Sequence, residues 1–415
     1  MDYTFPVIKN ISDVLPAIEG RDEFVVAEKE GYTVINYNVM MSDTFPDVHD
    51  LSGSYERAAS CGWGSEDVDN LYGQTHAKIR RECRGIIFDT ETGDIIRRPF
   101  HKFFNINERE ETQLHNLDFS KEHWVDTKLD GSMIAVFAHE GKLVWGTKMV
   151  APDFHDMIEK FVESSGIDYA GFCWKLINDG YTPIFEWMHP QKRIVIDYGK
   201  EPALTLLAVR HMVTGVFADI NNPVIAEFNI PVVEQHSKVT DPKAFMEYVH
   251  DLKNAEGFVI RWSNGHRVKI KAHEYLQIHR AKEAILQDRN ICELILDEKL
   301  DDVKAHLPAE DRDRLTQFES NIHFDIARRV RLIGMKLEYL RERGIDRKTF
   351  AIDPKHSVGV DAFMRPIIFK NFDNDIISGL RIGEDVRNTI RNNLGRTVKY
   401  EAIRDVWFPG LTYND

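Results

Sequence analysis

The stretch Trp124-Val125-Asp126-Thr127-Lys128-Leu129-Asp130-Gly131-Ser132 places a lysine where a strand is expected to end. The residues before Lys128 predict the strand, and Gly131 predicts a tight turn directly after it. A free lysine has a pKa of about 10.4 and is almost all ammonium at neutral pH. Burial at a strand end beside other cations would favour the neutral amine, the form that a nucleophile needs. The stretch thus indicates a reactive lysine, and by itself leaves open a solvated lysine in a surface hairpin.

Further segments agree with this interpretation and occur in a particular order. They are Cys83–Phe88 (CRGIIF), Phe100–Asn105 (FHKFFN), Gly146–Lys148 (GTK), Ile184–Trp187 (IFEW), Ala255–Ile260 (AEGFVI) and Val268–Lys271 (VKIK). The ordered set resembles the covalent nucleotidyltransferase superfamily, which contains DNA ligases, RNA ligases and mRNA capping enzymes. Within it the chain is most similar to the bacteriophage-type RNA ligase 1 family, on the run Arg193–Ile196 after Glu186 and on Asp346–Ala351. The likeness runs from about residue 35 to about residue 355.

The composition is typical of an intracellular enzyme. With 415 residues and 43% apolar content, two domains with their own cores are expected. Cys61, Cys83, Cys173 and Cys292 form no Cys-x-x-Cys pair, so neither a zinc site nor a disulfide framework is indicated. No secretory signal and no membrane span is expected, which favours the cytoplasm, or the host cytoplasm if a phage encodes the chain. The net charge of −14 does not exclude RNA, because phosphate contacts need local cations only.

The chain divides into two parts with different patterns of apolar residues. Up to about residue 275, short β-branched and aromatic runs predict strands in a mostly antiparallel sheet core. From about residue 276, apolar residues from Phe318 to Leu340 recur at steps of three and four and predict one long amphipathic helix that ends near Gly344. We therefore expect an α+β protein, with a nucleotidyltransferase (adenylylation) domain over residues 1–280 and a helical domain over residues 281–415 that recognises the RNA substrate.

The resemblance implies that Lys128 attacks the α-phosphorus of ATP and that Asp130 orients this lysine and its nucleotide. A carboxylate that only caps the Gly131 turn is the alternative for Asp130. Lys269 and Lys271 are two positions apart, so on a strand their side chains share one face. Two ammonium groups on one phosphate would neutralise charge that builds in the transition state. In the family this pair binds the α-phosphate; an ordinary exposed strand face is the alternative.

Other candidates surround this group. Glu186 is implied to accept hydrogen bonds from a ribose hydroxyl, and Glu256 to act near the lysine and the divalent metal; either could instead form a salt bridge. Arg84 and Lys102 are suited to the phosphates of ATP, since arginine offers a fork that fits phosphate oxygens. The alternative for both is a solvated strand charge.

Weaker matches complete the set. Tyr37 and Lys148 match nucleotide contacts of the family, although Met149-Val150 replaces the family's glycine–serine after this lysine. Tyr275 also matches a family position. Asp301, in the acidic pair Asp301-Asp302, is the metal candidate, with an acidic helix cap as its alternative.

The sequence thus predicts an ATP-dependent RNA ligase that uses magnesium. It would join 5′-phosphate and 3′-hydroxyl ends of single-stranded RNA or broken tRNA, as a monomer in RNA repair. Two alternatives stay open. One is a DNA ligase or a capping-type nucleotidyltransferase, although these usually carry a strand-rich barrel where this chain turns helical. The other is a noncatalytic RNA-end-binding repair protein.

Overall fold

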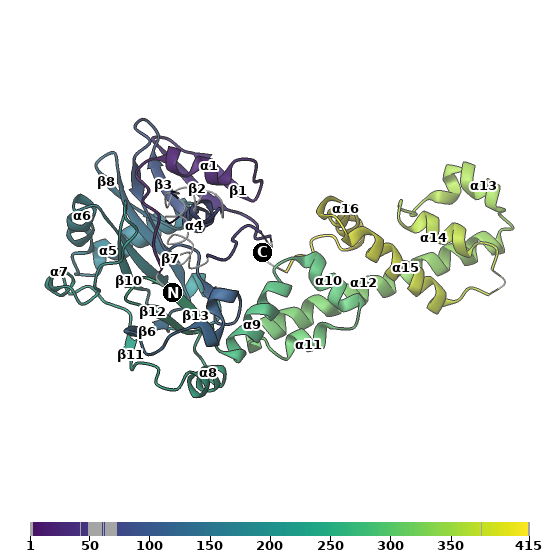
Figure 1. Cartoon of the computed structure of the whole chain (residues 1–415). Coiled ribbons are helices and arrows are strands. Elements are labelled where there is room, and N and C mark those ends of the chain that lie inside the picture. Colours follow the sequence, from purple (N-terminus) through teal and green to yellow (C-terminus); the bar gives the residue numbers. More distant parts are fainter. Residues whose placement is uncertain are drawn as a thin grey trace. The chain divides into compact units, whose positions relative to one another are not determined.

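The computed structural model describes residues 3–41, 43–48, 60, 62, 73–374 and 376–413; Cys61 lies outside them. The chain divides into two compact units, Met1–Leu276 and Gln277–Asp415. The first unit contains the strands and the second contains helices (Figure 1). The α+β class predicted from the sequence, with antiparallel sheets followed by a helical region, is confirmed.

Three sheets build the first unit. The first has the order β1 (Phe24–Glu28), β2 (Tyr32–Tyr37), β3 (Arg84–Asp89) and β4 (Ile95–Arg97). The second has the order β10 (Ala203–His211), β9 (Tyr181–Met188), β7 (Ser132–His139) and β8 (Lys142–Gly146). The third has the order β11 (Gln235–His236), β6 (His123–Lys128), β12 (Gly257–Trp262), β13 (Arg267–Lys271) and β5 (Phe104–Asn105). The named strand pairs are antiparallel except β13 with β5.

Helices cover these sheets. They are α1 (Leu15–Ile18), α4 (Gln74–Glu82), α5 (Pro152–Ser164), α6 (Tyr169–Asn178), α7 (Pro223–Glu227) and α8 (Pro242–His250), with α9 (His273–Ala284) beginning at the end of the unit. The side chain of Asp168 accepts from the Gly171 amide and starts α6, and Asp241 starts α8 in the same way. Helix α6 packs on β9 and α5 packs on β8 around a shared apolar core.

A buried ion-pair cluster ties the first sheet to the second. Glu82, at the end of α4, contacts Arg98 at 3.0 Å and Arg210 of β10 at 2.7 Å, and all three side chains are buried. Each charge is compensated by the others and by backbone carbonyls, which buried charges require. The cluster fixes how the two sheets face each other, and the cavity described below is lined from both.

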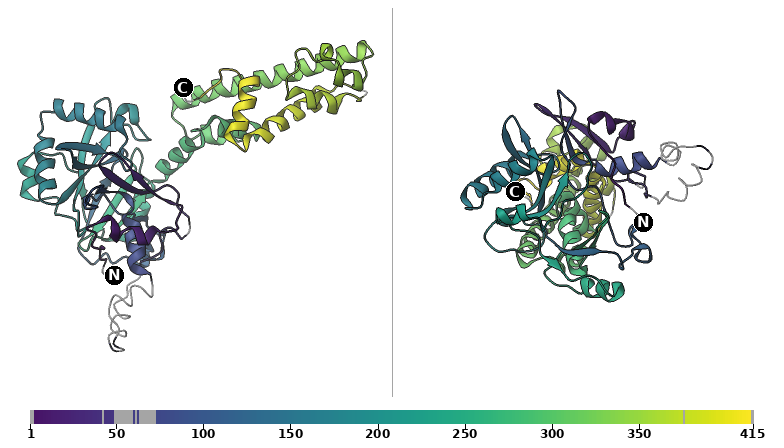
Figure 2. Two further views of the ribbon diagram at one scale, coloured as in Figure 1. Left: turned by 90° about the horizontal axis from the view of Figure 1, so that it is seen from above. Right: turned by 60° about the vertical axis from the view of Figure 1, so that its left-hand side comes forward.

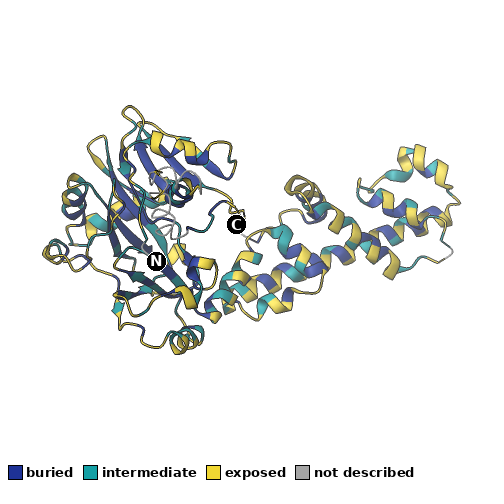
Figure 3. Cartoon of the chain, viewed as in Figure 1, coloured by how far each residue is buried: buried dark blue, intermediate teal, exposed yellow. Residues whose placement is uncertain are grey.

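The second unit is helical. It contains α10 (Asp288–Leu296), α11 (Leu300–Lys304), α12 (Ala309–Glu342), α13 (Arg347–Ile352), α14 (Met364–Asn371), α15 (Gly379–Leu394) and α16 (Thr397–Trp407). Helix α12 buries one stripe that includes Phe318, Ile322, Ile326, Ile333 and Leu337 (Figure 3), against α14 and α15 (Figure 2). The long amphipathic helix predicted from the spacing is confirmed, and Gly344 follows it with a φ of 61°. Within the described ranges, no helix combines the length and apolar character needed to cross a membrane.

Candidate functional site

The register of three neighbouring strands brings the central candidates together. Lys128, the last residue of β6, lies opposite Gly257, the first residue of β12, and Gly257 lies opposite Lys271, the last residue of β13. Glu256 immediately precedes Gly257, so its carboxylate falls between the two lysines. Residues that pair across three strands in this way are close in space although far apart in sequence.

Gly257 is the residue that allows this approach. Its φ is +139°, which residues with a side chain rarely adopt. A Cβ atom at this position would stand 2.0 Å from the carbonyl oxygen of Ile270 and 2.9 Å from the Cα of Lys271. A glycine is therefore required for β13 to pass beside Glu256.

Glu256 bridges the two lysines. Its Oε2 lies 2.8 Å from Lys128 Nζ and its Oε1 lies 2.9 Å from Lys271 Nζ, and its side chain is only 3% exposed. The sequence led us to expect cations around Lys128 and also Glu256 near it, with a salt bridge as an alternative role for Glu256. The structure places this carboxylate in direct contact with Lys128 and Lys271, two partly buried lysines whose charges it compensates.

Asp130 holds the loop that follows Lys128. Its Oδ2 accepts from the amides of Val195 and Ile196 at 2.7 and 2.8 Å, and its Oδ1 accepts from the hydroxyl of Tyr275 at 2.7 Å. Its own amide donates to the Tyr198 hydroxyl at 2.8 Å. Asp130 thus joins the end of β6 to two distant segments, and its side-chain bonds do not go to the glycine turn that was its alternative role.

The chain bends at Gly131, between β6 and β7, as the sequence indicated. Its φ is not in the left-handed region, so a second constraint explains the glycine. A Cβ atom on Gly131 would stand 2.4 Å from the carbonyl oxygen of Trp187. The glycine is needed because the loop after Lys128 passes directly over β9.

A cavity of about 370 Å³ opens beside Lys128. Lys128, Arg84, Lys148 and Glu186 supply charged groups to its wall. Its apolar wall consists of Phe100, Phe103, Met133, Leu207, Val233 and Val259. A cavity of this size, mostly apolar with a few polar groups, is typical of a site for a small organic ligand.

Four candidates from the first half of the sequence meet around one ring. The Nζ atoms of Lys102 and Lys148 lie 5.6 and 5.4 Å from the ring centre of Tyr37. Burial by itself raises the pKa of Tyr37, but Lys102, Arg84 and Lys148 outweigh it and lower that pKa below its usual value. Burial, followed by the charge of Arg84, lowers the pKa of Lys148. The four residues form one cationic group, as an anion site requires.

Lys269 extends this cationic group along β13. Burial is the first cause that lowers its pKa, to about 7, and the charges of Lys102, Lys128, Arg84 and Lys271 lower it further. Lys269 pairs with Val259 while Lys271 pairs with Gly257, so the two lysines share a face. In the free protein, the lysine that is partly neutral near pH 7 is therefore Lys269.

Glu186 lies on β9 between Phe185 and Trp187, which both enter the core. Its Oε1 accepts from the Gly131 amide at 3.0 Å. Burial raises its pKa to about 8; Lys128 opposes this shift and Glu256 adds to it. Glu186 is thus largely protonated at neutral pH, and among the described residues it makes no ion pair.

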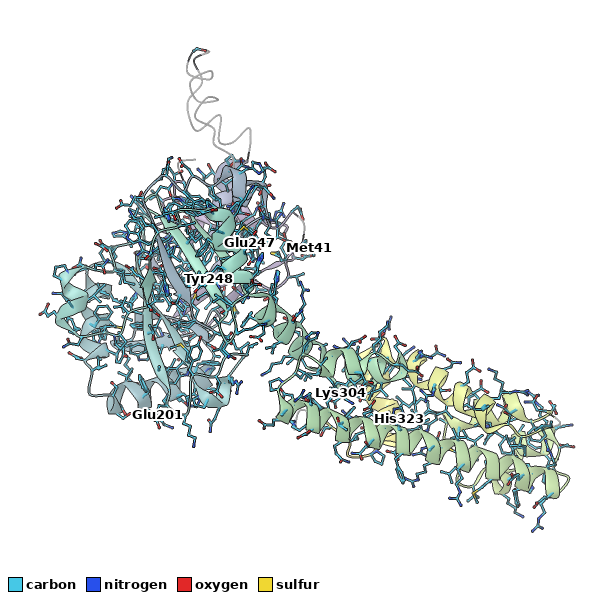
Figure 4. The ribbon with its side chains drawn as sticks, turned by 90° about the horizontal axis from the view of Figure 1, so that it is seen from below. Met41, Glu201, Glu247, Tyr248, Lys304 and His323 are labelled. Carbon is cyan, nitrogen blue, oxygen red and sulfur yellow. The ribbon has the colours of Figure 1, made fainter. Side chains whose placement is uncertain are left out.

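The metal candidate Asp301 belongs to the second unit. Asp301 is in the first turn of α11 in the helical unit, and its side chain is 93% exposed. It pairs only loosely, at 3.7 Å, with Lys304, which also contacts Glu319 at 2.5 Å. Figure 4 labels Lys304 in the helical unit. These features fit an acidic helix start. Across the described ranges, no three His, Cys, Asp or Glu side chains are grouped so as to hold a metal ion. The role of Asp301 stays a prediction.

Two supporting residues were missed from the sequence. Arg97 is fully buried and donates to the carbonyls of Gly85 at 2.8 Å and Lys148 at 3.0 Å, so it holds the segments that carry Arg84 and Lys148. The hydroxyl of Tyr198 accepts a hydrogen bond from the Asp130 amide. The residues around Arg97 and Tyr198 in the sequence do not indicate these roles, because both side chains bond to backbone groups that are remote in the chain.

Comparison with known proteins identifies the family that this site resembles. A family model described as RNA ligase matches residues 82–275. The resemblance to RNA ligases is confirmed over this segment. The matched segment contains Arg84, Lys102, Lys128 and Lys271, whereas Tyr37 lies before its first residue.

Individual relatives agree with this match. A protein of Thermovibrio ammonificans that is provisionally named an RNA ligase is 32% identical over 55% of this chain and 61% of its own length. RNA ligase 1 of bacteriophage TS2126 is 26% identical over 43% of this chain and 47% of its own. The chain thus spans less than two thirds of either relative. Among solved structures, a provisionally assigned ATP-dependent DNA ligase of Aquifex aeolicus is similar, with a TM-score of 0.44, 14% identity, and coverage of 74% of this chain and 72% of that one.

The raised pKa of Glu186 leads to a prediction about stability. A carboxyl group that stays protonated to about pH 8 when folded, but ionises near its usual 4.5 when unfolded, destabilises the fold as pH rises between these values. Relative to Glu186→Gln, which is neutral throughout, the wild type should lose stability across this window by at most about 1.4 kcal/mol per pH unit. Chemical denaturation at pH 5, 6, 7 and 8 measures the difference. A difference that does not change with pH would contradict the shift.

Proposed function

We propose that this protein is an ATP-dependent RNA ligase that works through a lysyl-AMP intermediate. The observation that carries the proposal is the row Lys128–Glu256–Lys271 beside a cavity with a cationic group at one side. A nucleophilic amine, cations for phosphate oxygens and an apolar wall for a base are the parts that nucleotidyl transfer to lysine needs. The RNA ligase match over residues 82–275 supports RNA as the substrate.

The reaction has three displacements at phosphorus. The Lys128 amine attacks the α-phosphorus of ATP, forms a P–N bond and releases pyrophosphate. The 5′-phosphate of an RNA end then attacks the lysyl-AMP phosphorus, breaks the P–N bond and becomes capped by AMP. Finally a 3′-hydroxyl attacks the activated 5′-phosphate, forms the phosphodiester and releases AMP. Positioning and charge neutralisation supply most of the catalysis in such in-line steps.

The site residues divide this work. Lys128 must lose a proton before it attacks, and Glu256, at 2.8 Å, is placed to accept it. Lys269 and Lys271 face the position that the α-phosphate would occupy, and Arg84, Lys102 and Lys148 are suited to the outer phosphates. The protonated Glu186 carboxyl suits a hydrogen bond with a ribose hydroxyl. Asp130 positions Lys128 through its bonds to Val195, Ile196 and Tyr275.

Magnesium is part of the proposal. This ion is usually bound through one or two carboxylates together with substrate phosphates. Glu256 is the carboxylate in contact with Lys128, so it fits a metal that arrives with ATP. When bound, the ion would neutralise phosphate charge.

The substrate details are finer proposals. We assign to the protein single-stranded RNA with 5′-phosphate and 3′-hydroxyl ends, such as broken tRNA, and action as a monomer. A cytoplasmic location, or the host cytoplasm for a phage-encoded chain, fits the free thiols of Cys83, Cys173 and Cys292.

The helical unit is proposed to select the RNA. Ten lysines and arginines lie on α12 or within six residues of its C-terminal end, but several are engaged within the unit. Arg329 donates to the Val406 carbonyl at 2.6 Å, Lys336 donates to the Val358 carbonyl at 3.0 Å, and Arg347 contacts Asp373 at 2.7 Å. Arg328, Arg331 and Lys348 are exposed and hold no contact shorter than 4.0 Å to an acid. These three are the best candidates for phosphate contacts.

The first prediction of this proposal concerns the nucleophile. Lys128→Ala and Lys128→Arg should both form no AMP adduct and join no ends, since a guanidinium stays protonated. Intact mass after incubation with ATP and Mg²⁺ measures the adduct, and its loss on adding RNA measures transfer. Lys243→Ala, which removes an exposed lysine of α8, is the matched control. Adduct formed at normal yield in Lys128→Ala would falsify the assignment.

The second concerns Lys269, whose pKa is about 7 in the free protein. Phosphate oxygens favour its charged form, so ATP binding should take up a proton and weaken as pH rises above 7. Lys269→Ala should slow adenylylation by about 100- to 1000-fold, the typical cost of losing one preorganised contact. Lys269→Arg stays charged and should flatten the dependence of the Michaelis constant for ATP on pH between 7 and 9. Parallel pH profiles of wild type and Lys269→Arg would reject this role.

The third concerns the helical unit. Changing Arg328, Arg331 and Lys348 to Gln should leave adenylylation unchanged and weaken RNA binding, because each lost contact to single-stranded phosphate lowers the salt slope of log affinity by about 0.7. Fluorescence anisotropy with a 5′-phosphorylated RNA at several salt concentrations measures this slope. The control changes three other exposed cations of the unit: Arg312 near the start of α12, Arg381 on α15 and Lys399 on α16. Equal slopes in both triple variants would leave the unit without a recognition role in these residues.

A further inference from the structure

Two polar groups at the cavity wall have bonding capacity that the described residues leave unused. Asp126 is 5% exposed, and its Oδ2 accepts from Arg261 Nε at 2.9 Å while its Oδ1 is buried without a partner. Arg267 is also 5% exposed, its Nε is buried without a partner, and within the described part of the chain its side chain forms no ion pair or hydrogen bond. Both residues line the cavity beside Lys128.

Such groups are costly unless a ligand completes them. A buried donor or acceptor without a partner typically costs about 1 to 3 kcal/mol, and more when it is charged. The guanidinium of Arg267 lies against two neighbouring rings, with its Cζ 4.0 Å from the centre of Phe217 and 5.1 Å from that of Phe100. Such ring contacts compensate part of the charge but give the N–H donors no hydrogen-bond acceptor of the usual kind. Burial correspondingly lowers the pKa of Arg267 to about 9.

The sheet register places these groups along the cavity from Lys128. Asp126 precedes Lys128 by two residues on β6, so their side chains share a face. Arg267 pairs with Arg261, which pairs with Trp124, four residues before Lys128. At about 3.3 Å per residue, the two rows lie about 7 and 13 Å along the strand from the lysine. That is the scale of a nucleoside monophosphate, so a nucleotide with its α-phosphate at Lys128 would bring its base near Asp126 and Arg267.

We infer that Asp126 and Arg267 read the base of the bound nucleotide and select adenine. This inference rests on the proposed nucleotidyl transfer to Lys128 and adds the basis of its base choice. Asp126 Oδ1 accepts from the exocyclic amino group, and Arg267 donates to the ring nitrogen beside it. Adenine has this donor and acceptor next to each other on either edge, as the amino group with N1 or with N7.

The pattern also rejects other purines. Guanine and hypoxanthine have an oxygen at position 6, which accepts and would face the Asp126 carboxylate. Two acceptors opposite each other leave both without a donor, and sites built for a hydrogen bond reject such analogues strongly. Arg261 holds Asp126 through the other carboxylate oxygen and so fixes which oxygen faces the cavity. Arg261 is a positioning residue in this scheme.

Arg267 lines two cavities, so the one that holds the base must be distinguished. Arg267 also lines a neighbouring cavity of about 650 Å³, together with Trp124 and Phe217. Asp126 lines the cavity beside Lys128 but not the neighbouring one. An acceptor and a donor that serve one ligand must share its cavity, which favours the cavity beside Lys128.

The experiment measures lysyl-AMP formation by the full chain with ATP, ITP, 1-deaza-ATP and 7-deaza-ATP. ITP replaces the amino group by oxygen, and each deaza analogue removes one ring acceptor. Wild type should use ITP, and one of the two deaza analogues, about ten- to a hundredfold less efficiently than ATP, the range for one hydrogen bond to a charged group. The deaza analogue that suffers identifies the edge that is read.

The variants connect each preference to its residue. Asp126→Asn can keep its oxygen toward Arg261 and turn its amide N–H toward the base, so the ATP-to-ITP ratio should fall at least tenfold. Arg267→Met should form the adduct about equally well from ATP and from the sensitive deaza analogue, so the ratio of the two efficiencies should be close to one. Arg267→Lys should retain part of the preference for ATP. Lys243→Met, on the exposed face of α8, is the control with wild-type ratios. Ratios are compared within one folded variant, so a loss of stability does not imitate the result.

Two outcomes overturn the inference. One is a wild type that uses ITP or both deaza analogues as well as ATP; this arm needs no variant to fold. The other is folded Asp126→Asn and Arg267→Met proteins that keep the wild-type ratios. Calorimetric measurement of the binding of the same nucleotides separates the two proposals. If ATP binds more tightly than its analogues but no adduct forms, the ligase chemistry alone is rejected. If an adduct forms equally well from ATP and its analogues, the base reading alone is rejected.

Discussion

The pairing of Lys128 with Gly257 and of Gly257 with Lys271 is the constraint on which the site depends. It aligns the ends of three strands and places Glu256 between two lysines that would otherwise repel each other. Gly257 makes the alignment possible, because any Cβ would collide with the Ile270 carbonyl. A shift of one residue in this register would turn Lys269 and Lys271 to the opposite face of the sheet. The chemistry of the site is therefore a consequence of strand pairing.

The ionisable side chains around this row have different surroundings, and their pKa values differ accordingly. Two lysines contact Glu256, whereas Glu186 is largely protonated because burial outweighs the attraction of Lys128. Burial and the neighbouring cations lower the pKa of Lys269, so this lysine is partly neutral near pH 7. The site therefore holds a carboxyl group with a raised pKa and a lysine with a lowered pKa, a combination that supplies both an acid and a base near neutral pH.

The sequence predicted what depends on local pattern. The strands that contain Lys128, Glu186 and Lys269 follow from β-branched and aromatic runs, and α12 follows from apolar residues at steps of three and four. Spacing alone also placed Lys269 and Lys271 on one face. What it missed depends on contacts between remote segments. The Asp130 carboxylate is held by Val195 and Ile196, about 65 residues away, and Gly131 is needed for its close approach to Trp187.

The same distinction explains why Asp126 and Arg267 were not candidates from the sequence. Each stands on a strand near a more conspicuous lysine and reads as an ordinary charged strand residue. Their importance depends on an unused acceptor and an unused donor, and these are recognised only when all possible partners are placed. Asp126 lies one side-chain step and Arg267 two steps along the same sheet face from the lysine row. The proposed base contacts and the lysine row therefore depend on the same strand register.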